Sequence, residues 1–133
     1  MIDTITALLQ NDATLAAILT GGVHHVQEIS RQTTPAAYDA NRELQPCALV
    51  KAEAATPWGV HRDSSRLYVV IYFYDRHGYT NIEAARRRVY DLLHRVKVIG
   101  SYEVRHANDM LDQEDEPLGA AMAVSRFVVT MER

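Results

Sequence analysis

The chain has 133 residues, 47% hydrophobic and 23% charged, a composition typical of one globular domain spanning residues 1–133 and not of a disordered tail. Its formal net charge of −3 excludes a basic field that would attract DNA or an anionic membrane. The chain has a single cysteine, Cys47, which excludes an intramolecular disulfide and is expected to be a small core residue. No apolar run approaches the ~18 residues needed to cross a bilayer. No signal peptide is visible, so we expect folding in a cytosol.

The first segment of the chain is predicted to be helical. Its apolar residues recur at helical spacing: Ile2, Ile5, Leu8, Leu9, Leu15, Ile18 and Leu19. Asn11 and Asp12 form an N-cap signal, so we expect a break there and a second short helix over 13–19. The pair Gly21-Gly22 then ends the helix, and residues 23–29 are predicted to form a short strand.

The middle of the chain alternates loops and strands. Residues 30–45, called the arm below, are polar and aperiodic, and loops of this length are usually functional or mobile. A strand is predicted over 47–55, and a second loop follows that carries the only tryptophan, Trp58. The strand predicted over 66–75 comes next.

This last strand is apolar on both faces. Strand alternation places Leu67, Val69, Ile71 and Phe73 on one side and Tyr68, Val70, Tyr72 and Tyr74 on the other, which we call the tyrosine face. A two-layer domain covers only one face of its sheet. We therefore expect a neighbouring subunit to cover the tyrosine face.

The C-terminal half is predicted to hold one helix and two strands. The helix is capped by Thr80 or Asn81, and its apolar stripe faces the sheet: Ile82, Ala85, Val89, Leu92 and Val96. Strands over 102–107 and 121–131 flank an acidic loop at 109–119. The predicted fold class is α+β: two layers, with a mixed, mostly antiparallel sheet and the helices packed on one face.

Candidate chemistry is sparse along the sequence. The six histidines have no metal-ligand spacing, and the acidic segment lacks the calcium-loop pattern, so no metal or cofactor is expected. Arg86, Arg87 and Arg88 are expected to pair with Glu83 and Asp91 and not with phosphates. No nucleophile elbow or phosphate loop is present, which argues against an enzyme.

The element order resembles the tail-terminator and tail-completion proteins of long-tailed bacteriophages. The resemblance rests on the helical start from Leu8 to Leu19, the following Gly21-Gly22-Val23, the strand that begins at Pro46, the alternating strand that ends near Asp75, and the helix from Glu83 to Leu93. Members often have a Val-Tyr-Pro-like segment after the glycines, where this chain has Val23-His24-His25-Val26.

The resemblance implies a virion protein at the head–tail junction. Its copies would form a ring, usually of six, that caps the tail tube, meets the connector or head-closure protein and lets DNA pass through the lumen without specific binding. A ring needs two different patches on each protomer. The residues expected in those patches, or facing a partner or the lumen, come from the tyrosine face, the arm and the two loops: Tyr68, Tyr72, Tyr74, Trp58, Arg31, Asp112, Glu114, Asp115 and Glu116.

Three other interpretations stay open from the sequence. A head-closure or neck protein of the same junction is the nearest. An intracellular binding module or a toxin–antitoxin-like regulator belongs to a different class. A small hydrolase would need a site without a motif among His61, Asp63 and His106.

Overall fold

The computed structural model describes residues 1–57, 64–97 and 101–132. The elements within them are α1 (Ile2–Gln10), α2 (Ala13–Ile18), β1 (Val23–His24), the 3-10 helix η1 (Pro35–Ala37), β2 (Cys47–Pro57), β3 (Ser64–Asp75), α3 (Thr80–Leu93), β4 (Ser101–Asp115) and β5 (Ala120–Glu132).

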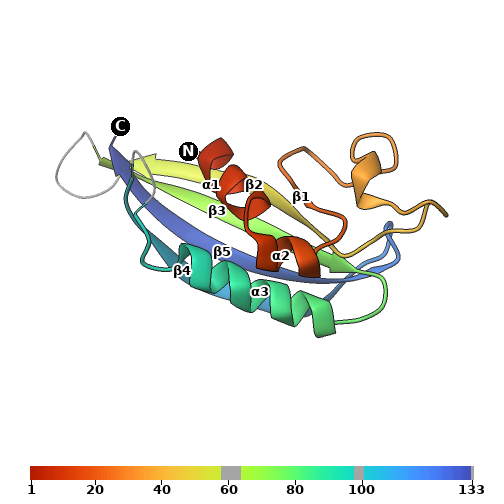
Figure 1. Cartoon of the computed structure of the whole chain (residues 1–133). Helices are drawn as coiled ribbons and strands as arrows, with labels where there is room; N and C mark the ends of the chain where they lie inside the picture. The colour runs from red at the N-terminus through yellow and green to blue at the C-terminus, as the bar shows by residue number, and fades with distance from the viewer. Residues whose placement is uncertain (58–63, 98–100, 133) are drawn as a thin grey trace.

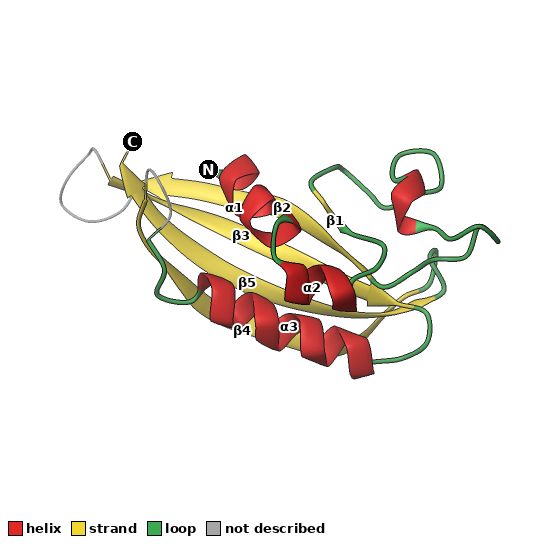
Figure 2. Ribbon diagram, in the orientation of Figure 1, coloured by secondary structure: helices red, strands yellow, loops and turns green. Residues whose placement is uncertain are grey.

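The strands form one sheet in the order β1-β2-β3-β5-β4. β1 runs parallel to β2, and the other neighbouring pairs are antiparallel. The helices α1, α2 and α3 lie on one side of this sheet (Figures 1 and 2). The predicted fold class, α+β with helices on one face of a mixed, mostly antiparallel sheet, is confirmed.

The main core lies between the helices and the sheet. Strand alternation directs Val69, Ile71 and Phe73 of β3 toward the helices, and all three side chains are fully buried. The helices contribute buried apolar residues from their facing stripes: Ile5, Leu9, Leu15, Ile82, Ala85, Val89 and Leu93. Burying these side chains is the dominant favourable contribution to folding.

The break between α1 and α2 occurs at the predicted place. The Asp12 side chain accepts a hydrogen bond from the Leu15 backbone N–H (2.9 Å), as an N-cap residue does. Its carboxylate also accepts two hydrogen bonds from the Arg88 guanidinium, at 2.9 and 2.7 Å. Asp12 therefore joins the N-terminal helices to α3.

The Asp12 carboxylate should make stability depend on pH. The hydrogen bonds from Arg88, followed by the one from Leu15, lower the pKa of Asp12 from 3.8 to about 2. Because the folded-state pKa is the lower one, the stabilisation is complete above about pH 4 and is lost as the pH falls toward 2. Asn caps helices as well as Asp does, so Asp12→Asn removes the charge and keeps the cap.

We expect Asp12→Asn to lower the free energy of unfolding above pH 4, with the difference from wild type shrinking toward pH 2. Urea unfolding at pH 6, 4, 3 and 2 measures this difference. Asp3→Asn, in the exposed first turn of α1, is the control. A difference that stays constant over this pH range would show that the ion pair contributes nothing.

Several predicted boundaries were wrong. β1 is only two residues long, where a strand over 23–29 was predicted. The N-cap of α3 is Tyr79, one residue before the predicted pair. The prediction of an acidic loop at 109–119 was also wrong, because β4 continues to Asp115 and only a short turn joins β4 to β5. Polar residues are tolerated there because β4 is the edge strand of the sheet.

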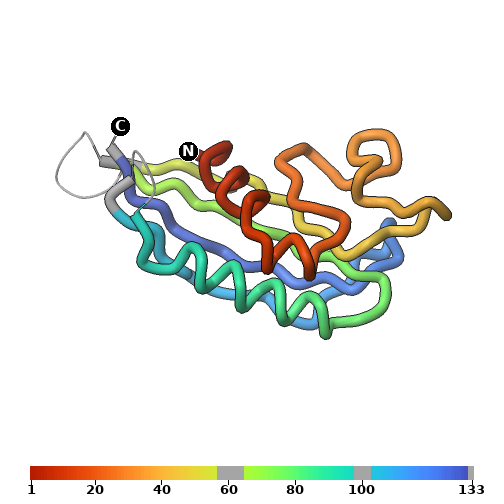
Figure 3. Tube along the Cα trace, viewed as in Figure 1, coloured from red at the N-terminus to blue at the C-terminus, as the bar shows by residue number. Residues whose placement is uncertain are grey.

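The arm, residues 30–45, has little regular structure besides η1. It follows β1 and leads into β2, and Figure 3 shows it near the end of the sheet where β4 turns into β5. Two hydrogen bonds connect Thr34 to Ser30 at the start of the arm. The Thr34 hydroxyl donates to the Ser30 carbonyl oxygen (3.0 Å) and accepts from the Ser30 N–H (3.1 Å). The arm is therefore an ordered loop.

Candidate assembly surface

On the tyrosine face Val70 and Tyr74 are buried and Tyr68 and Tyr72 are half-buried, and distant segments of the chain cover the end at Tyr74. A second cluster of buried residues lies there, on the side of the sheet away from the helices: Ile29, Ala37, Leu44, Cys47, Leu49, Tyr74 and Ala120. The arm and the residue before it supply the first three of these. Tyr74 is only 5% exposed, so it belongs to the core of this chain. Burial, followed by the charge of Asp115, raises the pKa of its hydroxyl.

Cys47 belongs to the same cluster, as predicted for a core residue. Its side chain is completely buried and the thiol is free. Burial, reinforced by the nearby Asp75 carboxylate, raises the pKa of the thiol to about 12. Such a thiol is not reactive at neutral pH.

Tyr72 and Tyr68 are only half-buried. The Tyr72 ring stacks against Tyr74, with centroids 6.5 Å apart and planes 11° apart. The Arg126 guanidinium lies 4.6 Å from the centre of the Tyr68 ring, and Arg126 pairs with Glu53 at 2.7 Å. These contacts order both rings and leave part of each exposed.

Between the two tyrosines the face is hollowed. A cavity of about 270 Å³ opens there, and its lining is mainly apolar with a charged rim: Glu53, Val70, Tyr72, Asn108, Met110, Met122, Val124 and Arg126. Met110 is 51% exposed at its margin. Aromatic residues, Met and Arg are the types enriched at protein–protein interfaces. This hollow suits a protein partner.

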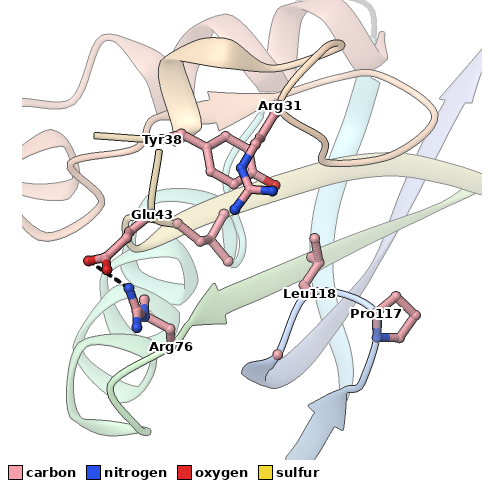
Figure 4. Close-up of a pocket in the computed structure, with 8 residues that line it drawn as sticks. Arg31, Tyr38, Glu43, Arg76, Pro117 and Leu118 are labelled. Atoms are coloured by element: carbon pink, nitrogen blue, oxygen red, sulfur yellow. Dashed lines mark ion pairs between the residues drawn. The ribbon is translucent and has the colours of Figure 1, made fainter. Parts of the chain in front are cut away.

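The arm bears Arg31 at a second pocket, of about 360 Å³ (Figure 4). Arg31 lies 5.4 Å from the centre of the Tyr38 ring, and its Nε donates to the Arg42 carbonyl oxygen (3.0 Å). Across the pocket Arg76 pairs with Glu43 at 2.7 Å, and Leu118 and Pro117 form the remaining wall (Figure 4). Two guanidinium groups thus border one pocket.

The acidic residues predicted as one loop have different environments. Asp112 lies in a bulge of β4, and Glu114 and Glu116 are exposed. Asp115 is half-buried and accepts a hydrogen bond from the Leu118 N–H (3.0 Å), which closes the turn into β5. Trp58, His61 and Asp63 lie outside the described residues.

A polar network around Asp109 was not anticipated from the sequence. Its carboxylate accepts hydrogen bonds from the Arg86 guanidinium (2.7 Å) and the Ser125 hydroxyl (2.7 Å), and lies 2.9 Å from His106 Nε2. Burial opposes ionisation of Asp109, but the hydrogen bonds from His106 and Ser125 and the charge of Arg86 outweigh it and lower its pKa.

This network joins α3 to β4 and β5 and is not arranged for nucleophilic catalysis. In a catalytic triad the histidine lies between the acid and the nucleophile, whereas here Asp109 separates His106 from Ser125. Ser125 is also 1% exposed and cannot meet a substrate. In the sequence, the spacing of three residues between His106 and Asp109 could have indicated that these two side chains interact. It carried no information about Arg86, which comes from another element, α3.

The predicted pairing of the arginine run is confirmed in part. Arg86 and Arg87 both pair with Glu83, at 2.6 and 3.2 Å. Arg88 instead forms its ion pair with Asp12, 76 residues away. The run therefore fastens α3 to its surroundings.

Within the described ranges, no group of three or more His, Cys, Asp or Glu side chains could hold a metal ion. None of the helices in the same ranges is both long and apolar enough to span a membrane.

No family model and no curated protein matches the chain. Among solved structures, a chain of the virion of a native gene transfer agent particle matches with a TM-score of 0.73 and 14% sequence identity. The match covers 100% of this chain and 95% of that chain. The two chains share a fold. At this identity the likeness concerns the fold alone, and it extends from one end of the chain to the other.

Proposed function

We propose that this chain is a structural protein of a phage-like virion, and that its copies form a ring, of six in the expected case, at the head–tail junction. There it caps the tail tube and joins it to the connector. The observation that carries the proposal is the fold match to a virion chain, which covers 100% of this chain and 95% of that chain. The family resemblance of the element order supports the same place in the particle.

The half-covered tyrosine face is the surface we assign to assembly. Tyr72 borders an open, mostly apolar hollow, and Arg126 at the rim of that hollow lies over the Tyr68 ring, whereas Tyr74 is excluded because the chain itself covers it. The net charge of −3 suits a lumen through which DNA slides without binding. A head-closure or neck protein is the second candidate, and it would use the same surface against a different partner.

The proposal predicts that Tyr72→Asp prevents assembly without unfolding the protomer. A carboxylate on this face would have to be desolvated when a partner covers it, while in the free protomer it stays in contact with water. We expect a loss of about 1–2 kcal/mol in unfolding free energy. Electron microscopy of purified tail tubes mixed with the protein would show rings at the tube ends for wild type and none for Tyr72→Asp.

The matched control is Tyr90→Asp, the same change at a tyrosine 40% exposed on the helix layer, which should leave the rings intact. Rings at wild-type levels with Tyr72→Asp would exclude this face from the interface. Global unfolding of that variant would show that Tyr72 is core. Absence of wild-type rings, with and without tubes, would reject the ring itself.

A further inference from the structure

The segment that follows α3 is held against the edge strand β4. After the helix ends at Leu93, Val96 forms an antiparallel bridge with Val104. The Arg95 N–H donates to the Val104 carbonyl oxygen (2.7 Å), and the Val104 N–H donates to the Val96 carbonyl oxygen (3.0 Å). Arg95 has a φ of 62°, a left-handed conformation that is unfavourable for an arginine. Contacts with β4 must therefore keep this turn in place.

A histidine ring supplies one of these contacts. The His106 N–H of β4 donates to Nδ1 of the His94 ring, at 3.0 Å. In an antiparallel ladder with Val96 opposite Val104, the residue opposite His106 is His94, and the carbonyl oxygen of His94 would accept this hydrogen bond. Here the imidazole nitrogen of the same residue takes the place of that oxygen. A titratable group thus continues the pairing between this segment and β4.

This hydrogen bond requires one charge state of His94. An imidazole nitrogen accepts a hydrogen bond only when it carries no proton, so the His94 ring must be neutral with its proton on Nε2. A protonated ring carries an N–H at both nitrogens, and its Nδ1–H would point at the His106 N–H. Two donors cannot bond each other. Protonation of His94 therefore breaks the hydrogen bond and leaves the His106 amide without this acceptor.

The aromatic neighbours of His94 tolerate a charged ring. Tyr90 of α3 stacks on the His94 ring, with centroids 4.6 Å apart and planes 18° apart. The Tyr90 ring also meets the His106 ring of β4 edge-on, at 5.3 Å, and Phe127 of β5 lies edge-on to His106 at 5.4 Å. Because an aromatic face attracts a cation, the stack with Tyr90 survives protonation. The hydrogen bond to the His106 amide is the contact that a proton on His94 removes.

The His106 side chain responds to acid in the opposite sense. Its Nε2 lies 2.9 Å from Asp109 Oδ1, and a positive charge on the His106 ring strengthens this contact. Burial opposes ionisation of Asp109, but the hydrogen bonds from His106 and Ser125 and the charge of Arg86 outweigh it and lower the pKa of Asp109. The Asp109 network therefore still holds α3 to β4 and β5 in mild acid, which restricts any opening to the segment after α3.

We propose that His94 is a pH-sensitive latch, closed against β4 when its ring is neutral and open when the ring is protonated. Histidine is the side chain that ordinarily changes charge between about pH 5 and 8, so the latch opens as the pH falls through this range. Opening loosens residues 94–97 from β4 and leaves the sheet and the helix layer in place. The latch belongs to the single protomer and does not depend on the proposed ring.

Amide hydrogen exchange measured by NMR tests the latch. Protection factors correct for the intrinsic effect of pH on exchange. The protection factor of the His106 amide should fall about tenfold from pH 7.5 to pH 5, the change expected for the loss of one hydrogen bond. Amides of the central strand β3 should keep their protection over the same range. At pH 7.5 the ring-nitrogen chemical shifts of His94 should show an unprotonated Nδ1.

Two variants of His94 separate the acceptor from its charge. The side-chain oxygen of Asn stands at the same position along the side chain as Nδ1 of His, accepts hydrogen bonds and does not titrate. His94→Asn should therefore keep the His106 amide protected at both pH values. His94→Leu has no acceptor and should leave this amide about tenfold less protected than in wild type at pH 7.5, with no further fall at pH 5.

The matched control is His106→Gln. This change removes the other titrating ring of the cluster and keeps a side-chain N–H that can donate to Asp109. The backbone amide of residue 106 remains, so its protection should depend on pH as in wild type.

Several outcomes would overturn the latch. One is equal protection of the wild-type His106 amide at pH 7.5 and pH 5, and another is a proton on Nδ1 of His94 at pH 7.5. A pH dependence that persists in His94→Asn, or that disappears in His106→Gln, would make His106 the titrating group instead. If His94→Leu does not fold, the comparison of wild type with His94→Asn still decides between these results.

Discussion

Phe73→Ala should lower the free energy of unfolding by about 3–5 kcal/mol, one of the two largest losses that we expect from a single substitution. Phe73 is the largest fully buried side chain of β3 and packs among residues of the helices and the sheet. Its removal loses the transfer free energy of the ring and leaves a cavity in a close-packed core. Chemical denaturation measures the loss, which corresponds to a fall in Tm of about 10 °C or more.

The matched control is Tyr68→Ala, five residues earlier in the same strand and on the opposite face. Its ring is half-exposed, so the loss should be less than half that of Phe73→Ala. Equal losses would mean that the tyrosine face is packed as tightly as the helix face within one protomer. That result would contradict its assignment as an assembly surface.

Asp109→Ala is the second large effect, with an expected loss of about 2–4 kcal/mol. The change removes the shared acceptor of three groups, the Arg86 guanidinium, the Ser125 hydroxyl and the His106 ring. Ser125 is 1% exposed, so its hydroxyl loses its hydrogen bond to Asp109 and has little access to water in exchange. Arg86 keeps only Glu83 as an ion-pair partner in the described part of the chain.

A double-mutant cycle with Arg86→Met isolates the ion pair from the rest of the network. We expect the double variant to be more stable than the sum of the single losses implies, because Met leaves no partly buried charge behind. Asp91→Ala, on the exposed surface of α3, is the control and should change stability by about 0.5 kcal/mol or less. Strict additivity in the cycle would show that Asp109 and Arg86 are not coupled.

Local patterns were sufficient to predict the elements that depend on short-range physics. The helix break at Asp12 followed from capping chemistry between residues three positions apart. The two faces of β3 followed from strand alternation, which is a property of the covalent backbone. The predicted strand and helix order then restricted the fold to a two-layer α+β arrangement.

Errors arose where a long-range contact decided the outcome. The segment after Ala107 is polar and was predicted as a loop, yet pairing with β5 keeps it in a strand despite the register shift between Met110 and Gln113. Arg88 was assigned to a neighbour on its own helix, and the fold instead brings Asp12 to it. Sequence spacing carries no information about a partner 76 residues away.

By itself, the sequence determined that one strand is apolar on both faces, because alternation assigns each side chain to a side whatever surrounds it. Only the tertiary structure decided what covers the second face. The residues around the arm cover Tyr74, whereas Tyr68 and Tyr72 remain partly open. The physical reason is that covering depends on where distant segments come to lie, and that is decided by packing over the whole chain.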